Sequence, residues 1–220
     1  MNNQLQKFIS ILQEKYNFSI KYKDSSVFMK VLGKILFFVP NFMTDFTTTI
    51  GKTIYLPNQN SLLDRDDMAL IAHECRHIYD SSNDFLFKLK YLFPQILSIV
   101  FFVFCFFSLW FLIPALICLA PFPAYWRKEF EINGYSTTLF VYNLILKSNE
   151  IDKNQRHLRL LNIAEKINNN FTSSSYYFMW SFGVIEDLNY IVELIVDEKL
   201  EDQNDFFKFI KESFEKSKLD

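Results

Sequence analysis

Residues 91–126 carry no charged side chain and are rich in Phe, Leu and Ile. Because about 20 apolar residues can span a bilayer as a helix, a transmembrane segment is the first interpretation of such a run. Two crossings need roughly 40 residues and a turn, and Pro114 and Pro121 interrupt the second half of the run. The run therefore predicts a hydrophobic helical hairpin that either spans a membrane tightly or dips into one leaflet.

The rest of the chain has the composition of one folded unit. Its 220 residues suit a single domain, 1–220, with residues 91–126 as an insertion. The net charge is −2 and no basic cluster is present, so the sequence offers no surface for nucleic acid. The three cysteines form no disulfide pattern, which favours a reducing compartment. Residues 1–18 place Gln, Lys and Glu among apolar positions, which predicts an amphipathic helix and not a signal peptide.

Periodicity predicts an α+β fold. Residues 18–24 alternate apolar and polar side chains as a strand does, and residues 45–57 read as a β-hairpin with its turn at Gly51 and Lys52. Asp64 and Asp67 are typical of a helix start and predict a helix over 64–79. Further helices are expected over residues 26–38, 127–146, 155–171, 183–200 and 205–217.

The segment "HECRH" places two of the three histidines four residues apart on the predicted helix. Side chains at positions i and i+4 lie on one face of a helix, so His73 and His77 can direct ring nitrogens at one metal ion. Neutral imidazole is a preferred ligand of zinc, and a catalytic zinc keeps one position for water. Glu74 follows the first histidine and can act as the general base for that water.

Three other residues that could bind a metal or take part in catalysis have simpler interpretations. Cys75 points away from the two histidines and is interpreted as a core residue. His157 lies between Arg156 and Arg159 and is interpreted as a surface histidine. Asp80 is interpreted as a helix-end residue. The alternative is that it forms a hydrogen bond to a histidine ring and supports it.

At these residues the sequence resembles the HExxH zincin metallopeptidases, and a later glutamate ligand would make the site gluzincin-like. It is most similar to the membrane-linked CAAX-type zinc endopeptidase family and its minimal phage-encoded relatives. That resemblance implies a third ligand in a pattern like E-x-x-A-D, for which "EINGY" offers Glu131 and the small residue Gly134. The sequence departs from the pattern at Tyr135. The resemblance also implies that the strand at 53–56 pairs with an extended substrate.

Two glutamates, Glu129 and Glu131, could supply the third ligand. They are two positions apart, about 200° around a helix, so only one can meet the histidines. One turn after Glu131 lies Gly134, followed on that side by Thr138, which leaves room for a close approach of the His73 helix. These positions favour Glu131 over Glu129.

The ligands also constrain the apolar run, because His73 and His77 precede it and Glu131 follows it. A single membrane crossing would separate them, so the chain must return to the side it left. Positive side chains at both ends of the run place both ends, and the catalytic part, on the cytoplasmic side of a membrane: Lys88, Lys90, Arg127 and Lys128. The alternative is a hairpin that is buried in a soluble cytoplasmic protein or forms a dimer interface.

Together these features predict a membrane-associated α+β zinc metallopeptidase of zincin-like fold that binds one zinc ion and cleaves a peptide or protein substrate. Glu74 would be its general base. Candidates for stabilising the oxyanion are Tyr135, Tyr176, Tyr177 and His157. The alternative is a membrane-inserting interaction or lysis-type protein whose zinc site is structural or vestigial.

Overall fold

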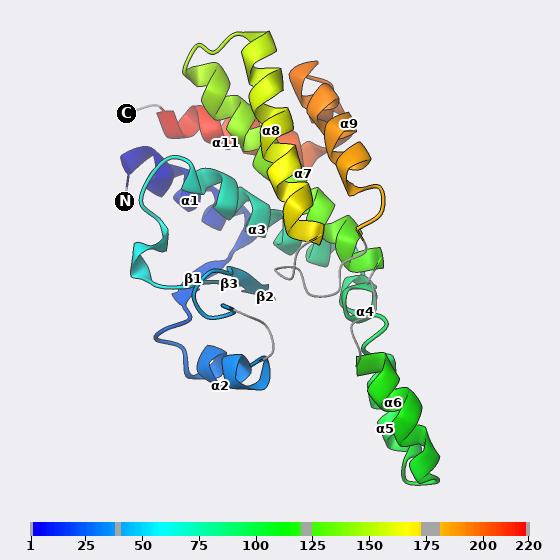
Figure 1. Cartoon of the computed structure of the whole chain (residues 1–220). Helices are drawn as coiled ribbons and strands as arrows, with labels where there is room; N and C mark the ends of the chain where they lie inside the picture. Colours follow the sequence, from blue (N-terminus) through cyan, green and yellow to red (C-terminus); the bar gives the residue numbers. More distant parts are fainter. Residues whose placement is uncertain (1, 38–40, 120–124, 173–180, 219–220) are drawn as a thin grey trace.

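The computed structural model describes residues 2–37, 41–119, 125–172 and 181–218, and its fold is mostly helical α+β (Figure 1). A small sheet lies below a layer of helices, and a pair of short helices projects from the same lower side. The described helices include α1 (Asn3–Tyr16), α2 (Val27–Ile35), α3 (Asp67–Asn83), α7 (Tyr125–Ser148), α8 (Lys153–Thr172), α9 (Val184–Val196), α10 (Leu200–Gln203) and α11 (Asp205–Lys218). The predicted fold class is confirmed at this level.

The sheet has three strands in the order β1-β3-β2, with β1 (Ser19–Tyr22), β2 (Thr48–Ile50) and β3 (Thr53–Leu56). β2 and β3 form the predicted antiparallel hairpin. Gly51 has a φ of 60° in the two-residue turn between them, and such hairpin turns need a positive φ at this position. β1 pairs with β3 in parallel.

The order of the strands corrects one expectation. β3 lies between β1 and β2 and forms backbone ladders with both, so it has no free edge for an extended substrate. β2 lies at the edge of the sheet and packs against α3. The strand at 53–56 was therefore the wrong choice for substrate pairing, because β1 already occupies its second edge.

Helix α3 starts three residues later than predicted, at Asp67, and continues to Asn83. The Asp67 carboxylate accepts hydrogen bonds from the backbone N–H groups of Leu63 and Asp64 at 2.6 and 3.0 Å. The Asp64 carboxylate accepts one from the Asp66 N–H at 3.0 Å. These carboxylates therefore stabilise the turn that leads into α3, and Asp64 is not its N-cap residue.

The helices share one hydrophobic core, in which α3 packs along α7. The predicted amphipathic helix α1 turns Leu5, Phe8 and Leu12 into this core and packs against α3 and α11. Helices α8 and α9 pack on each other and on α7. Helix α7 thus packs against neighbours along much of its length, and many of its side chains are buried.

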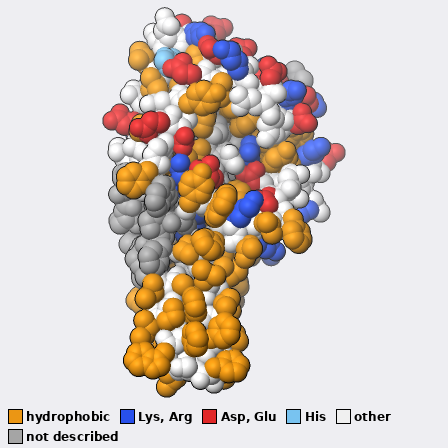
Figure 2. Space-filling model, turned by 90° about the vertical axis from the view of Figure 1, so that its right-hand side faces the viewer, with side chains coloured by type: hydrophobic (Ala, Val, Ile, Leu, Met, Phe, Trp, Pro, Cys, Tyr) orange, Lys and Arg blue, Asp and Glu red, His pale blue; other side chains and the backbone are white. Residues whose placement is uncertain are grey.

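The apolar run begins within α4 (Phe87–Leu92) and continues through α5 (Leu97–Phe104), a 3₁₀ turn (Leu109–Phe111) and α6 (Leu112–Leu119). α5 and α6 pack against each other and project away from the body of the protein (Figure 1). Figure 2 shows this projection covered with apolar side chains, whereas the body has a mixed surface. A hairpin buried in its own chain, the alternative raised from sequence, is therefore wrong, because the hairpin stands clear of the core.

Among the residues that the structure describes, no helix is both long enough and apolar enough to cross a membrane. The expected transmembrane helix is not found there, since the run is divided into short helices such as α5 and α6, each of eight residues.

The turn between β2 and β3 provides a test of the sheet. Replacing Gly51 with Ala should lower the free energy of unfolding by about 1–2 kcal/mol, because a side chain disfavours positive φ. A Cβ at this position would meet no atom within 4 Å, so the cost is one of backbone conformation alone. Urea denaturation measures it, with Lys52→Ala as a control that should change stability by less than about 0.5 kcal/mol. Equal stability of Gly51→Ala and the wild type would contradict the turn.

Candidate metal centre

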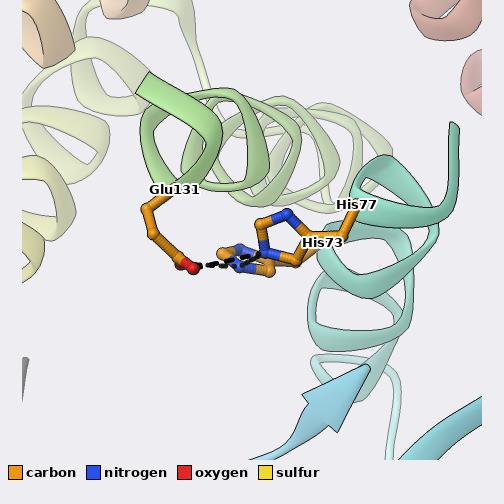
Figure 3. Close-up of side chains that lie close together, drawn as sticks. All are labelled: His73, His77 and Glu131. Atoms are coloured by element: carbon orange, nitrogen blue, oxygen red, sulfur yellow. Dashed lines mark hydrogen bonds and ion pairs between the residues drawn. The ribbon is translucent and has the colours of Figure 1, made fainter. Parts of the chain in front are cut away.

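Three side chains from two helices converge on one point (Figure 3). His73 and His77 come from α3, and Glu131 comes from α7. Nε2 of His73 lies 3.5 Å from one carboxylate oxygen of Glu131, and Nε2 of His77 lies 3.7 Å from the other. One donor atom from each residue lies within 4.8 Å of the others. This group could hold a metal ion.

The group is shielded from solvent, with side-chain exposures of 9% for His73, 12% for His77 and 8% for Glu131. Burial by itself disfavours charge on each of them. For His77, the Glu131 carboxylate outweighs burial and raises the pKa to about 9. For Glu131, the two histidines likewise outweigh burial and hold the pKa well below its usual range. A buried carboxylate of this kind favours a positive charge between the rings.

The other candidate ligand, Glu129, faces away from this group. Its side chain is 42% exposed and forms an ion pair with Lys128, whose Nζ lies 3.4 Å from a carboxylate oxygen of Glu129. The two glutamates therefore occupy opposite sides of α7, as their spacing predicts. The structure places Glu131, and not Glu129, beside the histidines.

Gly134 lets the two helices approach this closely. A Cβ built at Gly134 would lie 2.6 Å from Cε1 and 2.7 Å from Nε2 of His73. Both distances are far below a normal contact between nonbonded atoms, so the His73 ring occupies the space that any side chain would need. The small residue expected beside the centre is confirmed.

A hydrogen bond fixes the orientation of the His73 ring. Its Nδ1 lies 3.1 Å from the hydroxyl oxygen of Thr138, and that hydroxyl donates to the carbonyl of Gly134 at 3.4 Å. With its own proton engaged there, the hydroxyl accepts from the Nδ1–H of His73. This tautomer leaves the Nε2 lone pair directed at Glu131 and His77, as a metal ligand requires.

The His77 and His73 rings direct the same type of donor atom at Glu131. Its Nε2 lies 3.1 Å from Nε2 of His73, and both nitrogens face the same carboxylate. Two imidazole nitrogens with lone pairs directed at each other repel unless a proton or a metal ion lies between them. Two imidazoles and one carboxylate are also a common zinc ligand set. The residues present therefore fit a zinc ion.

Glu74 is held beside the group by the edge of the sheet. It is buried on α3, next to His73, and its Oε2 accepts a hydrogen bond of 2.6 Å from the hydroxyl of Thr49 on β2. This bond occupies one carboxylate oxygen and fixes the orientation of the other. Periodicity alone did not identify Thr49, because β2 and α3 meet only in the folded chain.

Tyr91, the first residue of the uncharged run, also reaches the centre. Its hydroxyl donates to Oε1 of Glu131 at 3.5 Å. Burial, and then the Glu131 carboxylate, raise the pKa of this hydroxyl, which therefore remains a donor. The Arg127 guanidinium donates to the backbone carbonyl of Tyr91 at 3.2 Å. Sequence reasoning missed Tyr91, whose only signal was its place at the start of the apolar run.

The remaining residues singled out from sequence are placed as follows. The Tyr135 ring packs edge-on against His73, with ring centroids 4.8 Å apart. His157 lies outside the group and pairs with Glu193 of α9 at 2.8 Å. Cys75 is fully buried in the core, as interpreted. Tyr176 and Tyr177 lie outside the described residues.

Asp80 supports the helix pair and not a histidine ring. Its carboxylate accepts from the Arg76 guanidinium at 2.8 Å and from the side-chain amide of Asn133 on α7 at 3.4 Å. Among the described residues, Nδ1 of His77 has no hydrogen-bond partner. Asp80 therefore ties α3 to α7 one turn beyond the metal centre.

No family model, curated protein or solved structure matches this chain. The assignment of the centre consequently depends on the geometry of its own residues.

The two glutamates of α7 provide a direct test of the ligand set. Loss of a residue that only hydrogen-bonds to a metal ligand lowers metal affinity roughly 10–100-fold. Glu131→Gln should lower zinc affinity by more than this, because it removes a charged donor. Glu129→Gln is the matched control and should bind zinc like the wild type. Competition with a chromogenic chelator measures both. Equal affinities of the two variants would exclude Glu131 as a ligand.

Gly134 offers a second test that changes no donor atom. Gly134→Ala should lower zinc affinity at least about 10-fold, because the new methyl group must push the His73 ring out of place. The same chelator assay applies, and circular dichroism should show that helix content is retained. Full zinc affinity in Gly134→Ala would show that the close packing of α3 and α7 is not needed for binding.

Proposed function

We propose that this chain is a zinc-dependent peptidase whose ligands are His73, His77 and Glu131 and whose general base is Glu74. The observation that carries the proposal is the buried group of two histidines and one glutamate, with a second buried glutamate next to His73. A zinc ion held by this group would act as a Lewis acid. It would lower the pKa of a bound water molecule toward neutrality and polarise the carbonyl group of the substrate.

The number of donors favours catalysis over a structural role. Structural zinc sites usually have four protein ligands, whereas catalytic sites have three and keep an open position. Within the described part of the chain, only three side chains form a group that could hold a metal. This observation supports the peptidase over the alternative of a structural zinc site in an interaction or lysis-type protein.

The proposed role of Glu74 as general base is supported by its burial next to His73 and by its bond to Thr49. With one oxygen held by Thr49, its carboxylate is oriented to accept a proton from water as the water oxygen attacks the peptide carbonyl carbon. The same carboxyl group then gives the proton to the leaving amine as the C–N bond breaks. Thr138 and Tyr91 position His73 and Glu131, respectively, and take no part in the proton transfer.

The edge strand β2 is the proposed binding site for the substrate backbone. It is the strand that lies against α3, and Thr49 connects it directly to Glu74. An extended peptide that pairs with the outer edge of β2 would therefore pass beside the general base. This assignment replaces β3, which is paired on both sides.

The role of Glu74 is tested by Glu74→Gln. The amide cannot accept a proton, so hydrolysis of a mixed peptide library should fall at least about 100-fold, while zinc content measured by elemental analysis stays at the wild-type level. Glu129→Gln, which changes an exposed glutamate in the same way, should keep full activity. Undiminished hydrolysis in Glu74→Gln would refute the mechanism. A zinc-loaded wild type that cleaves no peptide of the library would instead favour the vestigial-site alternative.

A further inference from the structure

The hairpin of α5 and α6 exposes apolar side chains on all of its sides. At its tip, Phe106, Phe107, Leu109 and Trp110 are 91%, 81%, 79% and 78% exposed. Exposed apolar residues continue along both helices: Ile99, Val100, Phe102, Val103, Phe104, Leu112, Ile113, Leu116 and Ile117. Figure 2 shows apolar side chains over most of the visible face of the projection.

This distribution favours a surrounding apolar medium over a protein partner. Neighbouring residues on a helix point about 100° apart, so pairs such as Phe102 with Val103, and Leu116 with Ile117, face different directions. A second copy of the chain or another protein would cover one face and leave the others in water. A helix that is apolar all round is typical of a membrane environment.

The size of the projection corresponds to one leaflet. Helices of eight residues, such as α5 and α6, are about 12 Å long, whereas the hydrocarbon core of a bilayer is about 30 Å thick. The hairpin can therefore enter half of a bilayer and return. Residues 91–126 carry no charge that would oppose this insertion.

Helix α2 provides a second, independent apolar surface. Val27, Val31 and Ile35 lie one turn apart and are all more than half exposed. The exposed Lys30 and Lys34 lie on the same helix, and this combination is typical of helices that lie in a membrane interface and bind anionic lipids. In Figure 1, α2 lies on the same lower side as the hairpin and at about the level of its root.

We infer that the hairpin of α5 and α6 inserts into one leaflet of an anionic lipid bilayer while α2 lies along the surface of the same leaflet. Tyr91 and Arg127 join the hairpin root to α7, and the Tyr91 hydroxyl donates to Glu131. The candidate metal centre is therefore held at a fixed, short distance from the lipid surface. This attachment does not depend on whether the centre is catalytic.

Vesicle flotation of the full-length protein tests the hairpin. The protein, diluted from detergent into vesicles of phosphatidylcholine and phosphatidylglycerol, should float with the vesicles. Replacing Phe106 and Phe107 together with Asp should weaken partitioning at least about 100-fold, since it removes two large apolar side chains and adds two charges. Leu158→Asp, which changes an exposed apolar residue on α8, is the matched control and should float like the wild type.

Two further measurements test which parts of the protein contact the lipid. Acyl chains brominated within the leaflet should quench tryptophan fluorescence of the wild type more than that of Trp110→Phe. Replacing Val31 and Ile35 with Asp should weaken flotation about 10-fold or more. Unchanged flotation of this α2 variant would overturn the part assigned to α2.

Two results would overturn the insertion of the hairpin. Either the wild type does not float with the vesicles, or the Phe106/Phe107 variant floats as well as the wild type. Another outcome would also overturn it: neither protein binds vesicles, the wild type forms a dimer without lipid, and the Phe106/Phe107 variant does not. A second copy of the chain would then cover the hairpin. Circular dichroism should show unchanged helix content in each variant, because all of the replaced side chains are exposed.

Discussion

The close approach of α3 and α7 at Gly134 is the contact on which the candidate centre depends. It brings the His73 ring into the space where a Cβ of residue 134 would lie, and it sets Glu131 against both histidines. Thr138, one turn further along α7, then accepts a hydrogen bond from the Nδ1–H of His73. Gly134 thus permits the close spacing of the helices, and Thr138 sets the direction of the His73 ring.

Polar side chains buried between α3 and α7 would lower the stability of the fold if they had no hydrogen-bond or ion-pair partners. At one turn, the Arg76 guanidinium satisfies Asp80, which also accepts from Asn133. At the preceding turn, the Glu131 carboxylate has two imidazoles and the Tyr91 hydroxyl as partners. The first arrangement is an ion pair within α3 that Asn133 extends to α7, whereas the second is a group that could hold a metal ion.

The hairpin and the centre share one structural link. Tyr91 ends the connection from α3 to the apolar run, and Arg127 lies where α7 begins, so the two residues close the root of the hairpin. Because the Tyr91 hydroxyl also donates to Glu131, movement at the root would shift the Glu131 carboxylate. The structure therefore connects the apolar projection to the polar centre through Tyr91 in α4, which precedes the projection and contacts Glu131.

The sequence by itself determined the features that depend on local periodicity. The i, i+4 spacing placed His73 and His77 on one face, and the polar stripe through Gly134 and Thr138 selected the side of α7 that carries Glu131. It did not reveal Thr49 or Tyr91 as partners of the centre, nor that β3 is paired on both edges by β1 and β2. It also left open whether the apolar run is buried or exposed. Only the tertiary structure decided these points, because each depends on contacts between segments far apart in the chain, and periodicity carries no information about them.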